Sequence, residues 1–85
     1  MGLFKSKEEK NLIEIIERVD MAMSNNYKDD AIENFARFEN ALADYKNRNV
    51  LKEKTLEKYE QIAESYRSRL KGYSHLDQKP FWTKN

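Results

Sequence analysis

The chain has 85 residues, of which 36% are charged and 39% hydrophobic, and its formal net charge is +1. A chain this short has room for one domain with a modest buried fraction. The absence of cysteine excludes disulfides, a thiolate nucleophile and cysteine-ligated zinc. No apolar run approaches the roughly 20 residues of a membrane-spanning helix, and the N-terminus lacks a secretory signal. We therefore expect a cytoplasmic protein without a transmembrane segment.

The first expected helix covers residues 7–24. Its apolar residues form one stripe at helical spacing: Leu12, Ile15, Ile16, Val19, Ala22 and Met23. Ser6 and Glu9 have capping-box spacing, in which each side chain satisfies a free backbone N–H at the helix start. The cluster Ser24-Asn25-Asn26 predicts a turn, with Asn26 as the cap of the next helix.

The second and third helices are expected over residues 27–46 and 50–71, separated by a turn at Asn47-Arg48-Asn49. Both carry apolar seams at heptad spacing: Ala31, Phe35, Phe38, Leu42 and Tyr45, then Leu56, Tyr59, Ala63, Tyr66, Leu70 and Tyr73. Gly72 is expected to end the third helix in a left-handed conformation. An irregular tail, residues 73–85, follows.

Turns of about three residues force neighbouring helices to run antiparallel. The prediction is therefore an all-α fold, an antiparallel up-down-up three-helix bundle over residues 1–72. A two-helix arrangement that dimerises is the main alternative. Four apolar residues lie off the seams and either widen the core or face another subunit: Ile13, Ile32, Val50 and Ile62.

The titratable residues do not suggest an enzyme. The single histidine, His75, falls in the expected tail, so no histidine pair or Glu-x-x-His metal spacing exists. A row of carboxylates on the third helix, Glu53, Glu57, Glu60 and Glu64, lacks facing histidines, and we interpret it as a solvated flank or a docking strip for a basic partner. We predict no catalytic residues, no metal site and no cofactor.

Charge is divided unevenly along the chain. Residues 1–64 have a net charge of −3 and residues 65–85 a net charge of +4. One interpretation is a regulator that binds nucleic acid or an anionic surface through Arg67, Arg69, Lys71, Lys79 and Lys84. Nucleic acid is the less favoured partner, because the basic footprint is sparse and the helices are too long for a helix-turn-helix reader.

Two adjacent aromatic residues, Phe81 and Trp82, stand in the polar tail. Left in water they lose free energy, so either they fold back over the end of the bundle or they anchor the tail in another protein. Our leading hypothesis is a small non-enzymatic interaction or adaptor protein. Besides Phe81 and Trp82, its contact surface would use the aromatic seam residues Phe38, Tyr59 and Tyr66, and self-association through them is one form of this hypothesis.

The segment Met1–Ser6 matches an N-myristoylation pattern, with Gly2 exposed after removal of Met1. That modification needs a eukaryotic enzyme, whereas the Lys-, Asn-, Glu- and Ile-rich composition is more typical of a bacterium or its phage. We interpret the match as chance and expect no membrane anchoring.

Residues Asn26-Tyr27-Lys28-Asp29-Asp30-Ala31-Ile32-Glu33-Asn34-Phe35 resemble the loop-to-helix junction of tetratricopeptide-type hairpins. They are equally similar to that of the three-helix domains that bind tails of membrane-remodelling filament proteins. In both families an Asn or small residue precedes a Tyr, and an Ala and an aromatic residue then pack at helical spacing. The resemblance implies a hairpin that binds other helices or peptides, and it assigns no individual binding residues.

Overall fold

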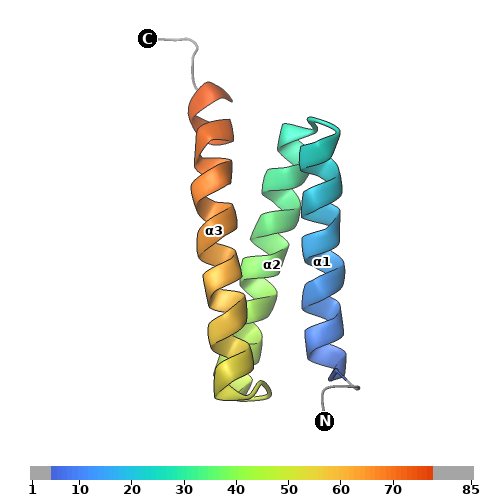
Figure 1. Cartoon of the computed structure of the whole chain (residues 1–85), viewed down its shortest axis with the longest axis vertical. Coiled ribbons are helices and arrows are strands. Elements are labelled where there is room, and N and C mark those ends of the chain that lie inside the picture. Colours follow the sequence, from blue (N-terminus) through green and yellow to red (C-terminus); the bar gives the residue numbers. More distant parts are fainter. Residues whose placement is uncertain (1–4, 78–85) are drawn as a thin grey trace.

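Three helices, α1 (Lys7–Ser24), α2 (Lys28–Arg48) and α3 (Glu53–Asp77), form an up-down-up bundle (Figure 1). The computed structural model describes residues 5–77, and their side chains as far as Lys71. Helix α2 contacts both α1 and α3. The predicted all-α three-helix bundle is confirmed, and the described part of the chain contains no strand. None of its helices combines the length and the apolar character needed to cross a bilayer.

The start of α1 is capped as predicted, but the capping box is only half used. The backbone N–H of Glu9 donates to the Ser6 hydroxyl at 3.1 Å, which satisfies one of the free donors at the helix start. The Glu9 carboxylate, expected to complete the box, instead accepts a hydrogen bond from the Tyr59 hydroxyl on α3 at 2.9 Å. One cap residue therefore also links two helices.

The turn between α1 and α2 corrects the expected role of Asn26. Asn26 has a positive φ of 62° and follows α1 in a Schellman arrangement. Its N–H donates to the carbonyl of Met23 (3.1 Å), and the Tyr27 N–H donates to that of Ala22 (2.8 Å). Tyr27, not Asn26, stands at the start of α2, and its side chain makes no capping hydrogen bond. Asn26 stops one helix because asparagine tolerates the left-handed conformation.

The turn after α2 repeats this device at Asn49, whose φ is 59°. The Asn49 N–H donates to the carbonyl of Lys46 (3.1 Å), and the Val50 N–H donates to that of Tyr45 (3.2 Å).

We expect Asn49→Gly to keep or raise the free energy of unfolding, because glycine has no Cβ penalty at positive φ. Asn49→Val should lower it by roughly 1–2 kcal/mol. Urea denaturation of the two variants checks this, and equal stabilities would contradict the left-handed role.

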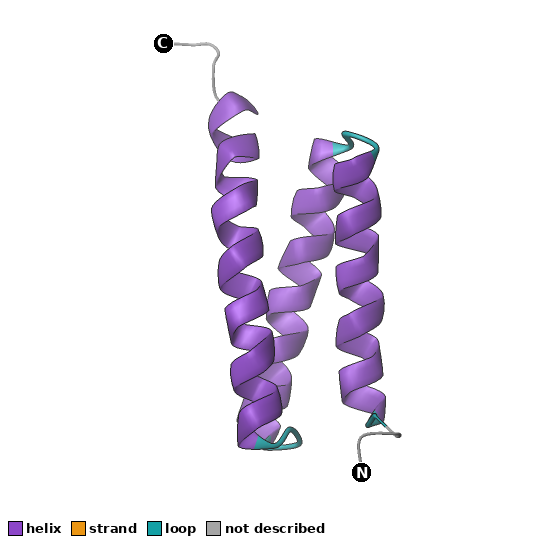
Figure 2. Cartoon of the chain, in the orientation of Figure 1, coloured by secondary structure: helices purple, strands orange, loops and turns teal. Residues whose placement is uncertain are grey.

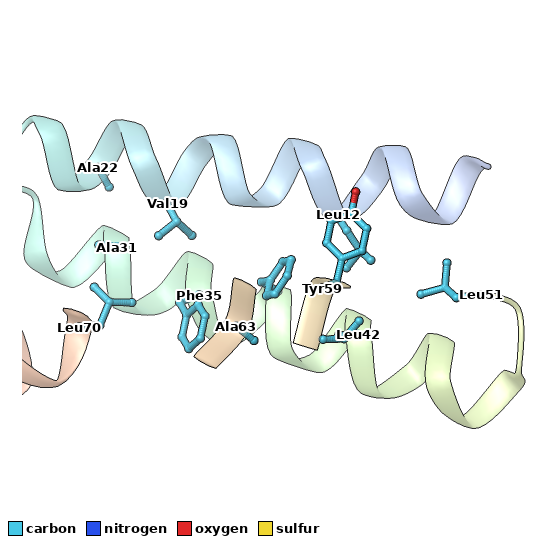
Figure 3. Close-up of a cluster of buried hydrophobic side chains, with 11 residues drawn as sticks. Leu12, Val19, Ala22, Ala31, Phe35, Leu42, Leu51, Tyr59, Ala63 and Leu70 are labelled. Carbon is cyan, nitrogen blue, oxygen red and sulfur yellow. The ribbon is translucent and has the colours of Figure 1, made fainter. Parts of the chain in front are cut away.

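Helix α3 begins three residues later than expected, because the loop buries one of its own side chains. The helix starts at Glu53 rather than near Val50. Val50 is exposed, whereas Leu51 is buried and belongs to the core. A short loop joins α2 to α3 after the left-handed residue Asn49 (Figure 2). The side chain of Leu51, in this loop, lies at the end of the buried cluster (Figure 3). Leu51 lies on no heptad seam, so the periodicity missed it.

The expected stop at Gly72 is wrong. Helix α3 continues through Gly72 to Asp77, and no described glycine has a positive φ. One glycine inside a helix costs only about 1 kcal/mol relative to alanine, and no proline follows before Pro80. The expected tail at residues 73–77 is therefore helical, and residues 78–85 lie outside the described part.

The core consists of the predicted seams. Side chains from all three helices turn toward one another (Figure 3), and the buried set contains Leu12, Val19, Ala22, Ala31, Phe35, Phe38, Leu42, Leu51, Tyr59, Ala63 and Leu70. Phe38, Leu12 and Val19 are its largest fully buried members. Burial of apolar area at about 25 cal/mol per Å² is the main source of stability in a chain without disulfides.

The residues off the seams divide between core and surface. Ile13 and Ile62 are half-buried and pack against the core. They therefore widen the core, which was one of the two predicted alternatives. Val50 is exposed. Ile32 is half-buried and lines a hollow between α2 and α3 instead of joining the core. It is the off-seam residue that bears on binding.

Candidate interaction site

Four aromatic rings form a continuous row between α2 and α3. The centroid distances are 6.5 Å from Tyr59 to Phe38, 6.1 Å from Phe38 to Phe35 and 6.4 Å from Phe35 to Tyr66. Pairs at such separations contribute about 0.5–1.5 kcal/mol beyond their buried area. This aromatic row fixes α3 against α2.

Tyrosine hydroxyls connect α1 to the other two helices. The Tyr59 hydroxyl donates to Glu9 at 2.9 Å, and that of Tyr66 donates to Asp20. The Tyr45 hydroxyl on α2 accepts from the Asn11 side chain at 2.8 Å. Within residues 5–77, no Cα atoms of α1 and α3 approach within 8 Å. The α1–α3 contact thus depends on long side chains rather than on close packing of the helices.

Each of these tyrosines also has a cation over its ring. The distances to the ring centroids are 5.4 Å for Arg48 over Tyr45, 5.2 Å for Lys58 over Tyr59 and 4.7 Å for Arg69 over Tyr66. A cation in this position is attracted by the negative face of the ring. The tyrosines are therefore structural links, with polar ends at the bundle surface.

An open groove runs along α2 and α3, and α1 contributes no residue to it. Its upper hollow, of about 450 Å³, is lined by Ile32, Phe35, Glu39, Glu64, Arg67, Ser68, Leu70 and Lys71. Its lower hollow, of about 360 Å³, is lined by Glu39, Leu42, Ala43, Lys46, Glu60, Ala63, Glu64 and Arg67. We call these two hollows together the α2–α3 groove. Its floor is apolar and its rims are charged.

An ion-paired cluster crosses the groove where the two hollows meet. The Arg67 guanidinium donates to Glu39 on α2 at 2.5 and 3.1 Å and to Glu64 on α3 at 2.7 Å. Hydrogen bonding to Glu39 raises the pKa of Arg67 above its ordinary value. We call these three side chains the clamp. Further along, Lys46 and Glu60 face each other across the lower hollow at 3.4 Å.

The clamp should add little to stability, because all three side chains are substantially exposed. Exposed ion pairs contribute about 0–1 kcal/mol. We expect Arg67→Gln to lower the free energy of unfolding by less than about 1 kcal/mol, and the difference to shrink further in 1 M salt. Thermal denaturation at two salt concentrations checks this. A larger, salt-independent loss would mean that Arg67 packs as part of the core.

The structure places the predicted aromatic contact residues mostly inside the bundle. Phe38 has no exposed surface and Tyr59 is 2% exposed, so neither ring is accessible to a partner in the folded monomer. Tyr66 is half-buried, with its hydroxyl engaged by Asp20. Phe81 and Trp82 lie outside the described residues. A partner surface must therefore be sought elsewhere on the described bundle, and the groove is the strongest candidate.

Two of the three described residues of the predicted basic cluster have intramolecular partners. Arg67 is held by Glu39 and Glu64, and Arg69 lies over the Tyr66 ring. The third, Lys71, is exposed at the edge of the upper hollow. Lys79 and Lys84 lie outside the described residues.

The row of glutamates on α3 is exposed throughout. Glu60 pairs with Lys46 and Glu64 pairs with Arg67. In the part of the chain that the structure describes, no group of three or more His, Asp or Glu side chains is arranged to hold a metal ion. The histidine side chain, on His75, lies beyond the described side chains.

Two features of the groove escaped sequence reasoning. The Glu39–Arg67 pair joins different helices, so no spacing along one helix reveals it. The apolar floor exists because Ile32 lies beside the seam and Ala43 is too small to cover its surroundings. The off-seam position of Ile32 was the one sequence feature that indicated this apolar floor.

Comparison of the chain with family models, curated proteins and solved structures gives no match.

Proposed function

We propose that this chain is a small, non-enzymatic interaction protein that binds an amphipathic helix of a protein partner in the α2–α3 groove. The observation that carries the proposal is the open apolar floor that remains after the three seams have packed. Amphipathic helices bind such grooves through residues spaced like i, i+3, i+4 and i+7. The resemblance of residues 26–35 to helix-binding hairpins also supports it.

The shape of the groove favours a helix over a compact ligand. Along α2, its lining extends from Ile32 to Lys46, which is about 21 Å at 1.5 Å per residue. A partner helix of about 14 residues has the same length. Small-molecule sites are enclosed and bury most of their ligand, whereas both hollows of this groove are open to solvent and only the exposed clamp lies between them.

The charges along the groove specify a complementary helix. Two carboxylates, Glu39 and Glu64, flank the middle, Lys71 lies at the upper end, and Lys46 at the lower end is paired with Glu60. The best fit is an apolar face with a basic residue at mid-length and an acidic residue toward the upper end. The basic residue of the partner helix competes with Arg67 for the carboxylates of Glu39 and Glu64. Because the clamp is exposed, this exchange of ion pairs costs little free energy.

A crosslinking experiment tests the location of binding. A photoreactive amino acid at Ala43, an exposed residue in the lower hollow, should capture a helical segment in an extract of the source cells. The same group at Glu17, exposed on α1, is the control. A synthetic peptide of the captured segment then permits titration calorimetry. Equal capture from both positions, or none from Ala43, would count against the proposal.

A matched pair of variants tests the affinity. Ala43→Arg places a long cation over the groove floor, and Asn40→Arg adds the same charge at an exposed α2 position outside the lining. We expect Ala43→Arg to weaken peptide binding at least tenfold, equivalent to about 1.4 kcal/mol, and Asn40→Arg to have little effect. Similar losses in both variants would indicate a nonspecific charge effect and reject the groove.

A further inference from the structure

We infer that this chain supplies an occupant for its own groove: residues 78–85 dock in the upper hollow, with Phe81 and Trp82 over Ile32 and Leu70. This self-docking goes beyond the proposed function, because it requires no partner. Its regulatory consequence, competition between the segment and a partner helix, rests on the proposed function.

The upper hollow offers an apolar surface to aromatic side chains. Ile32 is half-buried and outside the core, and the neighbouring Phe35 and Leu70 complete the floor. The hollow has a volume of about 450 Å³ and is open to solvent, so large side chains can enter it. Covering this floor removes apolar surface of the groove and of the segment from water at once.

The segment is long enough to reach this floor. From Leu70 to Asp77, α3 rises about 10 Å at 1.5 Å per residue. Residues 78–82, when extended, span up to about 16–18 Å. The C-terminal end of α3 and the start of α2 lie at the same end of the bundle (Figure 1), and Ile32 and Leu70 line the same hollow, so Ile32 is within reach of a chain that turns back from Asp77. Pro80 biases the residue before it toward an extended backbone.

The charges of the segment complement those beside the hollow. Lys79 and Lys84 are its only charged side chains. The first turns of α2 carry exposed Asp29, Asp30 and Glu33 next to Ile32. Four cations lie near the same end of the groove, Lys28, Arg37, Arg67 and Lys71, and Glu33 pairs with Arg37. With Glu39 and Glu64 of the clamp included, five carboxylates against four cations leave a local net charge of −1, which weakly favours a basic segment.

Trp82 is the single tryptophan of the chain, and its fluorescence therefore tests the docking directly. We expect the emission of Trp82 in the full chain to be blue-shifted and protected from acrylamide, compared with a free peptide of residues 78–85. Ile32→Ser should remove both effects, while circular dichroism shows that the helices remain. The matched control Ile13→Ser, at a half-buried isoleucine of α1 outside the groove lining, should preserve them.

Three outcomes would overturn the inference. Emission of the full chain equal to that of the free peptide would mean that the segment does not dock. Loss of protection in Tyr27→Ser but not in Ile32→Ser would place it over the end of the bundle, where Tyr27 is exposed. Loss of protection on dilution would identify the groove of a second copy as the site. Since no partner helix is present, these results are independent of the proposed function.

Discussion

Phe38→Ala should lower the free energy of unfolding by about 3–5 kcal/mol, the range for removing a buried phenylalanine ring. Phe38 is completely buried and contacts two rings of the aromatic row, Phe35 and Tyr59. Folded domains have about 0.05–0.15 kcal/mol of stability per residue, so this single change removes a large part of the total. Urea denaturation followed by circular dichroism measures the loss.

Two further variants separate core packing from other effects of the substitution. Phe38→Leu keeps most of the volume and should cost much less than Phe38→Ala. Arg37→Ala changes an exposed neighbour on the same helix and should shift stability by less than about 0.5 kcal/mol. If Phe38→Ala left stability unchanged but altered the mass in solution, the ring would belong to an interface between copies and not to the core.

The second large effect is expected at alkaline pH. Burial, the hydrogen bond to Glu9 and the charge of Glu9 together raise the pKa of Tyr59 above its ordinary value of 10.0. Burial and Asp20 raise the pKa of Tyr66 in the same direction. The folded state therefore binds these phenolic protons more tightly than the unfolded state does. Their contribution is complete below about pH 10 and is lost as the pH rises through the raised pKa values.

Tyr59→Phe should flatten this alkaline loss of stability, because phenylalanine has no phenolic proton to release. At neutral pH the same change removes one hydrogen bond to a carboxylate and should cost about 1–3 kcal/mol. Denaturation curves between pH 7 and pH 11 measure both effects. Tyr27→Phe is the matched control, since Tyr27 is 59% exposed. A profile for Tyr59→Phe parallel to that of the native chain would refute the raised pKa of Tyr59.

Periodicity predicted the three helices and most of their buried residues, but not the ends of α3 or the burial of Leu51. The seams of α2 and α3 repeat at heptad spacing, and a short polar turn permits only an antiparallel return. Phe35, Phe38 and Leu42 are accordingly buried. The same reasoning cannot decide whether an asparagine in a turn ends the preceding helix or caps the following one. Asn26 is compatible with a cap before α2 and with a left-handed residue after α1, and only the backbone path decides between them.

The candidate site was less predictable, because it depends on pairs of residues far apart in sequence. Arg67 was expected to contribute to a free basic surface, but Glu39 approaches it from another helix and neutralises it. Tyr59 was expected at a contact surface, but its ring packs against Phe38 of α2 and is buried. Helix periodicity assigns a residue to a face, whereas the identity of the opposite residue depends on the relative positions of two helices.

The separation of α1 from α3 has a consequence for folding kinetics. Among the described residues, close backbone approaches between helices occur only where the helices are adjacent in sequence, so no long loop has to close before the core can form. Chains dominated by such local contacts fold in microseconds to milliseconds. The α1–α2 hairpin can form first and present one side of α2 to α3. The tyrosine links to Glu9 and Asp20 then form last and complete a rapid, largely sequential assembly.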